Sequence, residues 1–153
     1  MPQFNPPDPV QAKVNIAIAR FLEQDSYLLE VDANERTISN RLAVHLSREF
    51  PGWDIDCEYN RNLDQIKRLR IKQRKGRGQV SVQNVVPDII VHRRSTNKNL
   101  LAIEIKKTSS PESDNHDLGK LRALKRQLGY RYALFLKFKC GSECGLTGFK
   151  WAR

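Results

Sequence analysis

Two short apolar stretches, residues 85–92 and 100–107, constrain the fold of this chain more than any other feature. Each has the length of a single β-strand, and the polar turn between them predicts a β-hairpin. Each stretch also carries a carboxylate, Asp88 in the first and Glu104 in the second. A carboxylate inside a buried strand is costly unless it is paired or bound to a metal ion. The hairpin is therefore the candidate location of a functional site.

The expected register of this hairpin brings the two acids together. If the turn is centred on Thr96, Asp88 and Glu104 are both eight residues from the centre and lie opposite each other. Because side chains alternate between the faces of a strand, Lys106 shares a face with Glu104. Two acids and a lysine are thus expected to converge. The alternative is purely structural: backbone amides satisfy Asp88 at a strand end, and Glu104 and Lys106 form a plain ion pair.

A helix that precedes the hairpin supplies a third acid, Glu35. The sequence Asp32-Ala-Asn-Glu35 has the form of a capping box and predicts a helix start, and Pro51-Gly52 predicts its end. The apolar stripe of this helix lies within about 60° of Glu35, at 100° per residue. Glu35 is therefore expected to face the sheet and to reach the Asp88–Glu104 pair. Glu35 also fits a role as the capping residue alone, and the two roles are compatible.

The remaining sequence predicts further helices and strands. Asp8-Pro9 combines a capping carboxylate with a proline at the first helical position, and predicts a helix over residues 10–24. A leucine stripe predicts a later helix over residues 118–128 that ends at Gly129. The expected strands are residues 53–59, 85–92, 100–107, 132–138 and 146–151. Together these elements predict an α/β fold with a mixed central sheet flanked by helices.

Basic residues are concentrated in two blocks of the chain. The net charge is +10, but residues 1–60 carry −5, whereas residues 61–78 carry +7 and residues 118–153 carry +8. Such blocks indicate an anionic partner such as nucleic acid, although a solvated loop and a solvated helix face are the alternatives. The side chains expected to contact phosphates are Lys67, Arg68, Arg70, Lys72, Lys120, Arg122, Lys125 and Arg126.

The domain organisation follows from length and composition. The 153 residues suit one compact domain. We expect residues 1–9, which are rich in proline, to be a flexible arm, and residues 10–153 to form a single domain. Within that domain, residues 61–84 are a basic insert that forms either a long loop or a projecting hairpin.

Several classes of protein are disfavoured. No apolar stretch approaches the roughly 18 residues of a membrane span, so no membrane partner is expected. The amino end does not have the apolar run of a secretory signal, which predicts a cytoplasmic protein. Three cysteines do not suit a disulfide framework. The sequence contains no Cys-x-x-Cys pair, which disfavours a zinc site. No recognisable serine or cysteine nucleophile motif accompanies the histidines, which disfavours a triad hydrolase.

The arrangement of Glu35 on a helix, Pro87-Asp88, and Glu104-Ile105-Lys106 resembles the PD-(D/E)xK nuclease superfamily. The predicted order of helix, three strands, helix and strand over residues 32–139 resembles that family's restriction-endonuclease-like α-β-β-β-α-β core. The insert at residues 61–84 is longer than this core needs, and its role stays open.

The resemblance implies a function. Asp88 and Glu104 are expected to hold Mg²⁺ (or Mn²⁺), and Lys106 to position the attacking water. Glu35 is expected to assist as a third ligand, through the metal or its water. The implied reaction is phosphodiester hydrolysis in DNA, with RNA and a homodimer left open. The alternatives are a non-catalytic nuclease-like module that binds nucleic acid in a larger complex, and a small basic structural protein whose acids are incidental.

Overall fold

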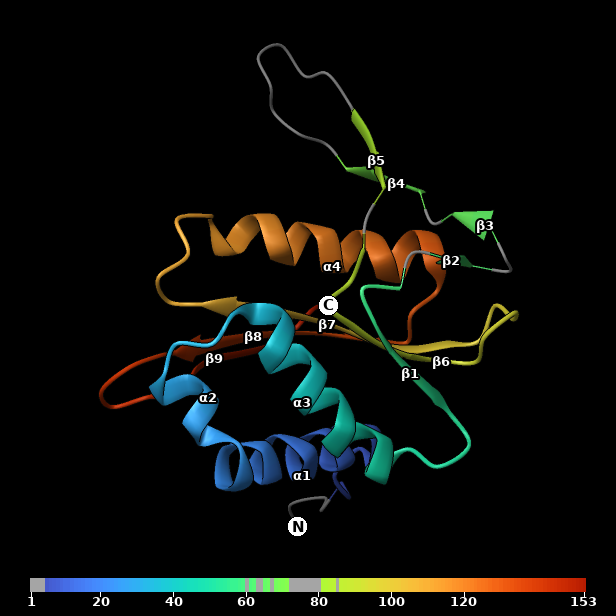
Figure 1. Cartoon of the computed structure of the whole chain (residues 1–153). Helices are drawn as coiled ribbons and strands as arrows, with labels where there is room; N and C mark the ends of the chain where they lie inside the picture. The colour runs from blue at the N-terminus through green and yellow to red at the C-terminus, as the bar shows by residue number, and fades with distance from the viewer. Residues whose placement is uncertain (1–4, 60, 63–64, 67, 72–80, 85) are drawn as a thin grey trace.

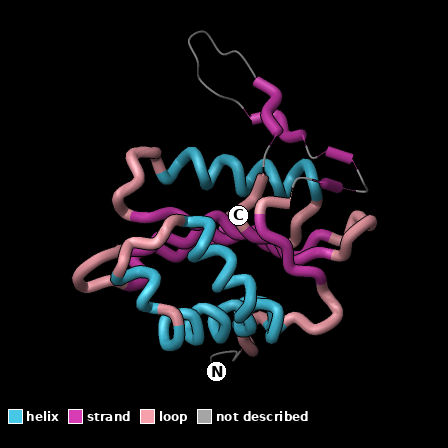
Figure 2. The backbone as a smooth tube through the Cα atoms, in the orientation of Figure 1, coloured by secondary structure: helices cyan, strands magenta, loops and turns pink. Residues whose placement is uncertain are grey.

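A five-stranded mixed sheet forms the centre of the molecule. The computed structural model describes residues 5–59, 61–62, 65–66, 68–71, 81–84 and 86–153. The strand order is β1-β6-β7-β8-β9, and each neighbouring pair is antiparallel except β7 and β8, which run parallel (Figures 1 and 2). The strands are β1 (Asp54–Cys57), β6 (Ile89–His92), β7 (Asn99–Lys107), β8 (Tyr132–Lys139) and β9 (Gly145–Trp151). The predicted α/β class with a mixed central sheet is therefore confirmed.

Helices cover both faces of this sheet. Figure 1 shows α1 (Pro9–Gln24), α2 (Ser26–Glu30) and α3 (Glu35–Glu49) on one side and α4 (Asp114–Leu128) on the other. The alternation of side chains along β6 divides the core accordingly: Ile89 and Val91 pack with the cluster under α1 and α3, and Ile90 packs with the cluster under α4. Helix α4 connects β7 to β8, as a parallel pair requires a crossover.

Helix α1 begins as the sequence predicts. The Asp8 carboxylate accepts hydrogen bonds from the amides of Val10 (2.8 Å) and Gln11 (3.1 Å), and Pro9 is the first helical residue. The Tyr132 hydroxyl donates to the other Asp8 oxygen at 2.6 Å. The end of the predicted arm is thus tied to β8, whereas residues 1–4 lie outside the described residues.

Two predicted helix starts are wrong. Helix α3 is capped by Asn34, whose side chain accepts from the amide of Thr37 at 2.8 Å, and not by Asp32. Asp32 adopts a left-handed conformation (φ +54°) and pairs instead with Lys107 Nζ at 2.9 Å, so Glu35 is the first residue of the helix. Helix α4 begins at Asp114, four residues before the expected start, because Ser113 caps it. It ends at Gly129 as predicted, in a left-handed conformation (φ +68°).

The basic insert contains hairpin segments in its described parts. Strands β2 (Arg61–Asn62) and β3 (Gln65–Ile66) pair with each other, and so do β4 (Arg68–Ile71) and β5 (Ser81–Asn84). Strand β4 contacts α4, and Figure 1 shows the β4–β5 pair on the side of α4 away from the sheet. Of the residues expected to contact phosphates, Arg68 and Arg70 lie in β4, and Lys67 and Lys72 lie outside the described residues.

Among the described residues, no helix has the length and apolar character needed to cross a membrane.

Candidate active site

Asp88 lies directly opposite Glu104, as the predicted hairpin register requires. Ile89 pairs with Ile103, so the next pair outward is Asp88 with Glu104, and the register shifts only after Val91. Asp88 itself precedes β6 and is not inside the strand, which corrects the sequence-based placement. Its Oδ2 accepts the amide hydrogen of Ile105 at 2.7 Å. Beyond the last pair of strand residues, the Asp88 side chain therefore takes the place of a backbone acceptor for β7. This hydrogen bond holds the Asp88 carboxylate against β7.

Glu104 is almost fully buried, and its nearest cation comes from α4. Lys120 Nζ lies 2.9 Å from Glu104 Oε1 and also donates to the carbonyl of Val86 at 3.2 Å. This contact is an ion pair between a buried carboxylate and a lysine ammonium group. Lys120 was expected on a nucleic-acid-binding face, but it points into the site.

Lys106 shares the sheet face of Glu104 but pairs with acids of α4. Its Nζ is 3.0 Å from Asp117 Oδ2 and 3.8 Å from Asp114 Oδ1, and its side chain is buried. Sequence reasoning missed Asp114, Asp117 and the role of Lys120. Their spacing of three residues places them along one side of a helix. The sequence predicts a loop over residues 109–115, which includes Asp114, and a helix only from residue 118, so neither acid lies in the predicted helix.

Glu35 joins these residues in one pocket of about 180 Å³. Its Oε1 accepts the amide hydrogen of Lys107 at 3.3 Å, which links the start of α3 to the end of β7. We call this cavity the acid pocket; its lining residues are Glu35, Asp88, Glu104, Ile105, Lys106, Ser110, Glu112, Asp117 and Lys120. Five acids and two lysines give it a formal excess of three negative charges, in a chain whose net charge is +10. All four predicted catalytic residues thus meet in the acid pocket.

Burial of two neighbouring acids shapes the electrostatics of the pocket. Burial raises the pKa of Glu104 well above its usual range, the nearby Asp88 raises it further, and Lys120 opposes the change. Burial also raises the pKa of Asp88, although the Ile105 amide and Lys120 favour its charged form. Burial alone would lower the pKa of Lys120, but Glu104 and Asp88 outweigh it and raise that pKa. The raised pKa values mean that the lysines of the pocket do not fully compensate the cost of burying both carboxylates as anions.

The residues of the acid pocket fit a hard divalent cation. Within the described ranges, no group of three or more His, Cys, Asp or Glu side chains is arranged to hold a metal ion by itself. Mg²⁺ typically takes one or two protein carboxylates and fills its remaining positions with waters and phosphate oxygens. The adjacent Asp88 and Glu104 supply such a pair, and both line the acid pocket. Glu35 lines the same pocket.

The other basic residues of α4 keep the outward orientation that the sequence predicts. Arg122 and Arg126 are exposed, and Lys125 is half-buried with its Nζ 3.1 Å from the carbonyl of Ala152. None of these three residues lines the acid pocket. The eight predicted nucleic-acid contacts therefore divide between the insert, the outer side of α4 and, for Lys120, the acid pocket.

Comparisons of the chain with protein-family models, curated proteins and solved structures find no match. The geometry of the acid pocket therefore carries the functional inference.

We predict that Asp88→Asn makes the metal-free protein more stable at neutral pH, by about 1 kcal/mol. An acid whose pKa is raised in the folded state keeps its proton up to a higher pH than the same acid does in the unfolded chain. Stability therefore falls as pH rises from the ordinary carboxyl range towards the raised pKa. Asparagine keeps an oxygen for the Ile105 amide but removes one of the two charges. Urea unfolding in EDTA between pH 4 and pH 8 measures the effect.

The exposed Glu30 provides a control, since Glu30→Gln changes one charge outside the pocket. Its unfolding free energy should follow the wild-type pH dependence. If the unfolding free energy of Asp88→Asn also followed the wild-type pH dependence across this range, the explanation that the buried charge of Asp88 destabilises the fold would be wrong.

Proposed function

We propose that this chain is a metal-dependent nuclease of the PD-(D/E)xK kind that hydrolyses phosphodiester bonds in DNA. The observation that carries the proposal is the adjacent pair of the half-buried Asp88 and the buried Glu104, in a pocket that also holds Lys106 and Glu35. An excess of negative charge in a basic chain is what a cation site on a nucleic-acid-binding protein requires.

The topology supports the family resemblance. From α3 to β8 the described core elements run helix, three antiparallel strands, helix, and a strand parallel to its neighbour, with the insert between β1 and β6. This order agrees with the α-β-β-β-α-β core that the sequence motifs imply. It also explains how acids distant in the chain meet, because β6 and β7 are neighbours and α3 begins beside the end of β7.

In this proposal, Asp88 and Glu104 hold Mg²⁺ or Mn²⁺ through their carboxylate oxygens. When bound, such an ion lowers the pKa of a coordinated water and neutralises charge on the phosphate. Asp117 and Asp114 orient Lys106 inside the fold. A cation fixed in advance near the phosphate stabilises the negative charge that develops during hydrolysis. Glu35 orients the attacking water from the α3 side.

A specific observation favours the second candidate, a nuclease-like module that binds nucleic acid without cutting it. Both lysines of the acid pocket already have acidic partners, Lys106 with Asp117 and Lys120 with Glu104. Such pairs neutralise part of the site without a metal ion. The two candidates differ in a single measurement, which is divalent-ion-dependent cleavage of DNA or RNA.

We expect one Mg²⁺ or Mn²⁺ ion to bind to the wild-type protein and not to Asp88→Asn. Carboxyls with raised pKa values must lose their protons before they bind a cation, so affinity should increase as pH rises from 5 to 8. Isothermal titration calorimetry in two buffers of different ionisation enthalpy should record proton release on binding. Glu30→Gln should bind as wild type does; equal binding by Asp88→Asn would remove the proposed ligand.

Replacing Lys106 should separate cleavage from binding. Lys106→Ala is expected to lower the cleavage rate of plasmid DNA at least ~10²-fold, the usual scale for losing one electrostatic partner of the transition state. DNA affinity should change little, because the acid pocket holds only a small share of the basic residues. Single-turnover cleavage with Mg²⁺ or Mn²⁺, against EDTA, gives the first quantity, and fluorescence anisotropy gives the second.

The matched control is Lys13→Ala, which removes an exposed lysine on α1. It should cut at the wild-type rate. Cleavage by Lys106→Ala at that same rate would contradict the role of Lys106, and the absence of any cleavage by wild type would favour the binding module.

A further inference from the structure

Helix α4 separates opposite charges onto its two flanks. Asp117 and Lys120 line the acid pocket. At 3.6 residues per turn, Arg126 leaves the helix about 180° from Asp117, and Arg122 leaves it about 160° from Lys120. Both arginines are exposed, and in the described part of the chain neither has an acidic partner. The outer flank of α4 therefore carries positive charge that the fold does not neutralise.

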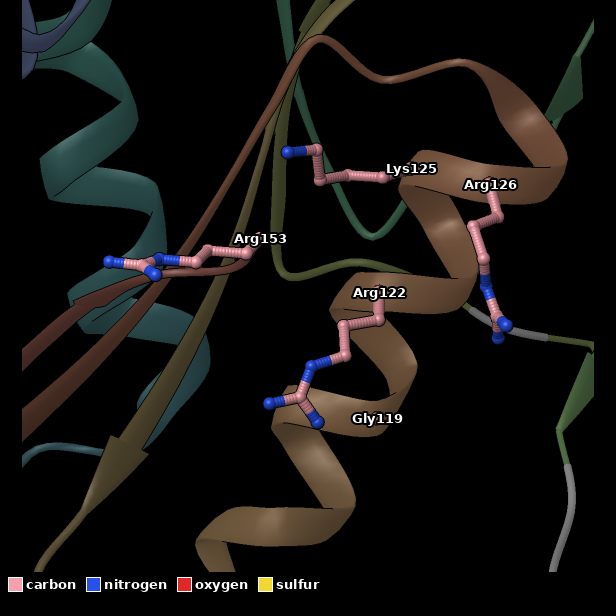
Figure 3. Close-up of a pocket in the computed structure, with 5 residues that line it drawn as sticks. All are labelled: Gly119, Arg122, Lys125, Arg126 and Arg153. Atoms are coloured by element: carbon pink, nitrogen blue, oxygen red, sulfur yellow. The ribbon is translucent and has the colours of Figure 1, made fainter.

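These side chains line a second pocket, which we call the basic pocket. Its volume is about 460 Å³, and it is lined by Gly119, Arg122, Lys125, Arg126 and Arg153 (Figure 3). In Figure 3, Arg122 and Lys125 extend from α4 on the side where Arg153 lies. The hydrogen bond from Lys125 to the carbonyl of Ala152 joins α4 to the residues after β9. Among the described residues, no acid lines this pocket.

An adjoining pocket extends the positive surface. It has a volume of about 380 Å³, shares Arg122 and Arg153 with the basic pocket, and adds Lys150. The described residues that line it also include no acid. Together the two pockets present five basic side chains, and the buried Leu118 and Ala152 line the second of them.

We propose that the basic pocket binds phosphate groups of a nucleic-acid backbone, at a site separate from the acid pocket. The planar guanidinium groups of Arg122 and Arg126 offer paired donors that match phosphate oxygens. The choice of nucleic acid as the ligand rests on the proposed function, whereas the location of the site rests on the pocket alone.

The geometry also sets the length of ligand that engages both pockets. An α-helix with its side chains is about 10–12 Å across, and one strand of a duplex advances about 3.4 Å per nucleotide along the axis. A phosphate in the basic pocket and one beside Lys106 are therefore separated by roughly the width of a helix, about 10–12 Å. A single phosphate group cannot occupy both pockets, so the inferred substrate is a polynucleotide.

The double variant Arg122→Ser/Arg126→Ser tests this site. Both side chains are exposed, so folding should persist, and circular dichroism checks it. We measure anisotropy of labelled 20-nucleotide and 3-nucleotide DNA in EDTA over a range of salt concentrations. The slope of log affinity against log salt for the 20-mer should decrease by roughly one to two in magnitude. The 3-mer should bind weakly to both proteins, and Mg²⁺ affinity by calorimetry should not change.

The control is Arg48→Ser, which removes an exposed arginine of α3 on the opposite face of the sheet and should leave the slope unchanged. Inorganic pyrophosphate is titrated against the bound 20-mer to distinguish a site for free phosphates from a site for a nucleic-acid backbone. If the basic pocket is a site for free phosphates, pyrophosphate displaces the DNA at low concentration. An unchanged slope in the double variant, an equal loss in Arg48→Ser, or displacement by pyrophosphate overturns the proposal. If wild type cuts no nucleic acid but the double variant loses slope, the proposed catalysis fails and the basic pocket stands.

Discussion

The hydrogen bond from the Ile105 amide to the Asp88 carboxylate fixes the position of one acid of the acid pocket. It holds Asp88 against β7, opposite Glu104, at the point where the pairing of β6 with β7 ends. Burial raises the pKa of both acids, Asp88 raises the pKa of Glu104 further, and Lys120 reaches across from α4 to Glu104. Lys106 of β7 pairs with Asp117, which belongs to α4 like Lys120. The acid pocket is therefore a network of acidic and basic side chains in which the acids outnumber the lysines.

Helix α4 connects the two halves of the proposed function. One flank supplies Asp117 and Lys120 to the acid pocket, and the other supplies Arg122 and Arg126 to the basic pocket. The helix is buried against the sheet through a leucine stripe between these flanks, which fixes its rotation. A substitution that shifted α4 would thus disturb the acid pocket and the basic pocket together. A surface substitution on one flank would affect only the pocket on that flank.

Strand periodicity and turn length made the centre of the site predictable. A hairpin centred on Thr96 has only one register that keeps its apolar faces buried, and that register places Asp88 opposite Glu104. The cap of α3 was predicted incorrectly because Asp32 and Asn34 are both good capping residues, and the choice depends on the distant Lys107. The role of Lys120 was missed for a similar reason. A basic residue on a helix reveals its partner only when the rotation of that helix on the sheet is known.

The most direct test of the central claim is anomalous diffraction from crystals soaked in Mn²⁺. The account predicts an anomalous peak at the manganese edge between the carboxylates of Asp88 and Glu104, within about 2.3 Å of an oxygen of each. Asp88→Asn crystals soaked in the same way should show no peak there. A wild-type map without a peak between these two residues, or with a peak only elsewhere, would contradict the assignment of the acid pocket as a metal centre.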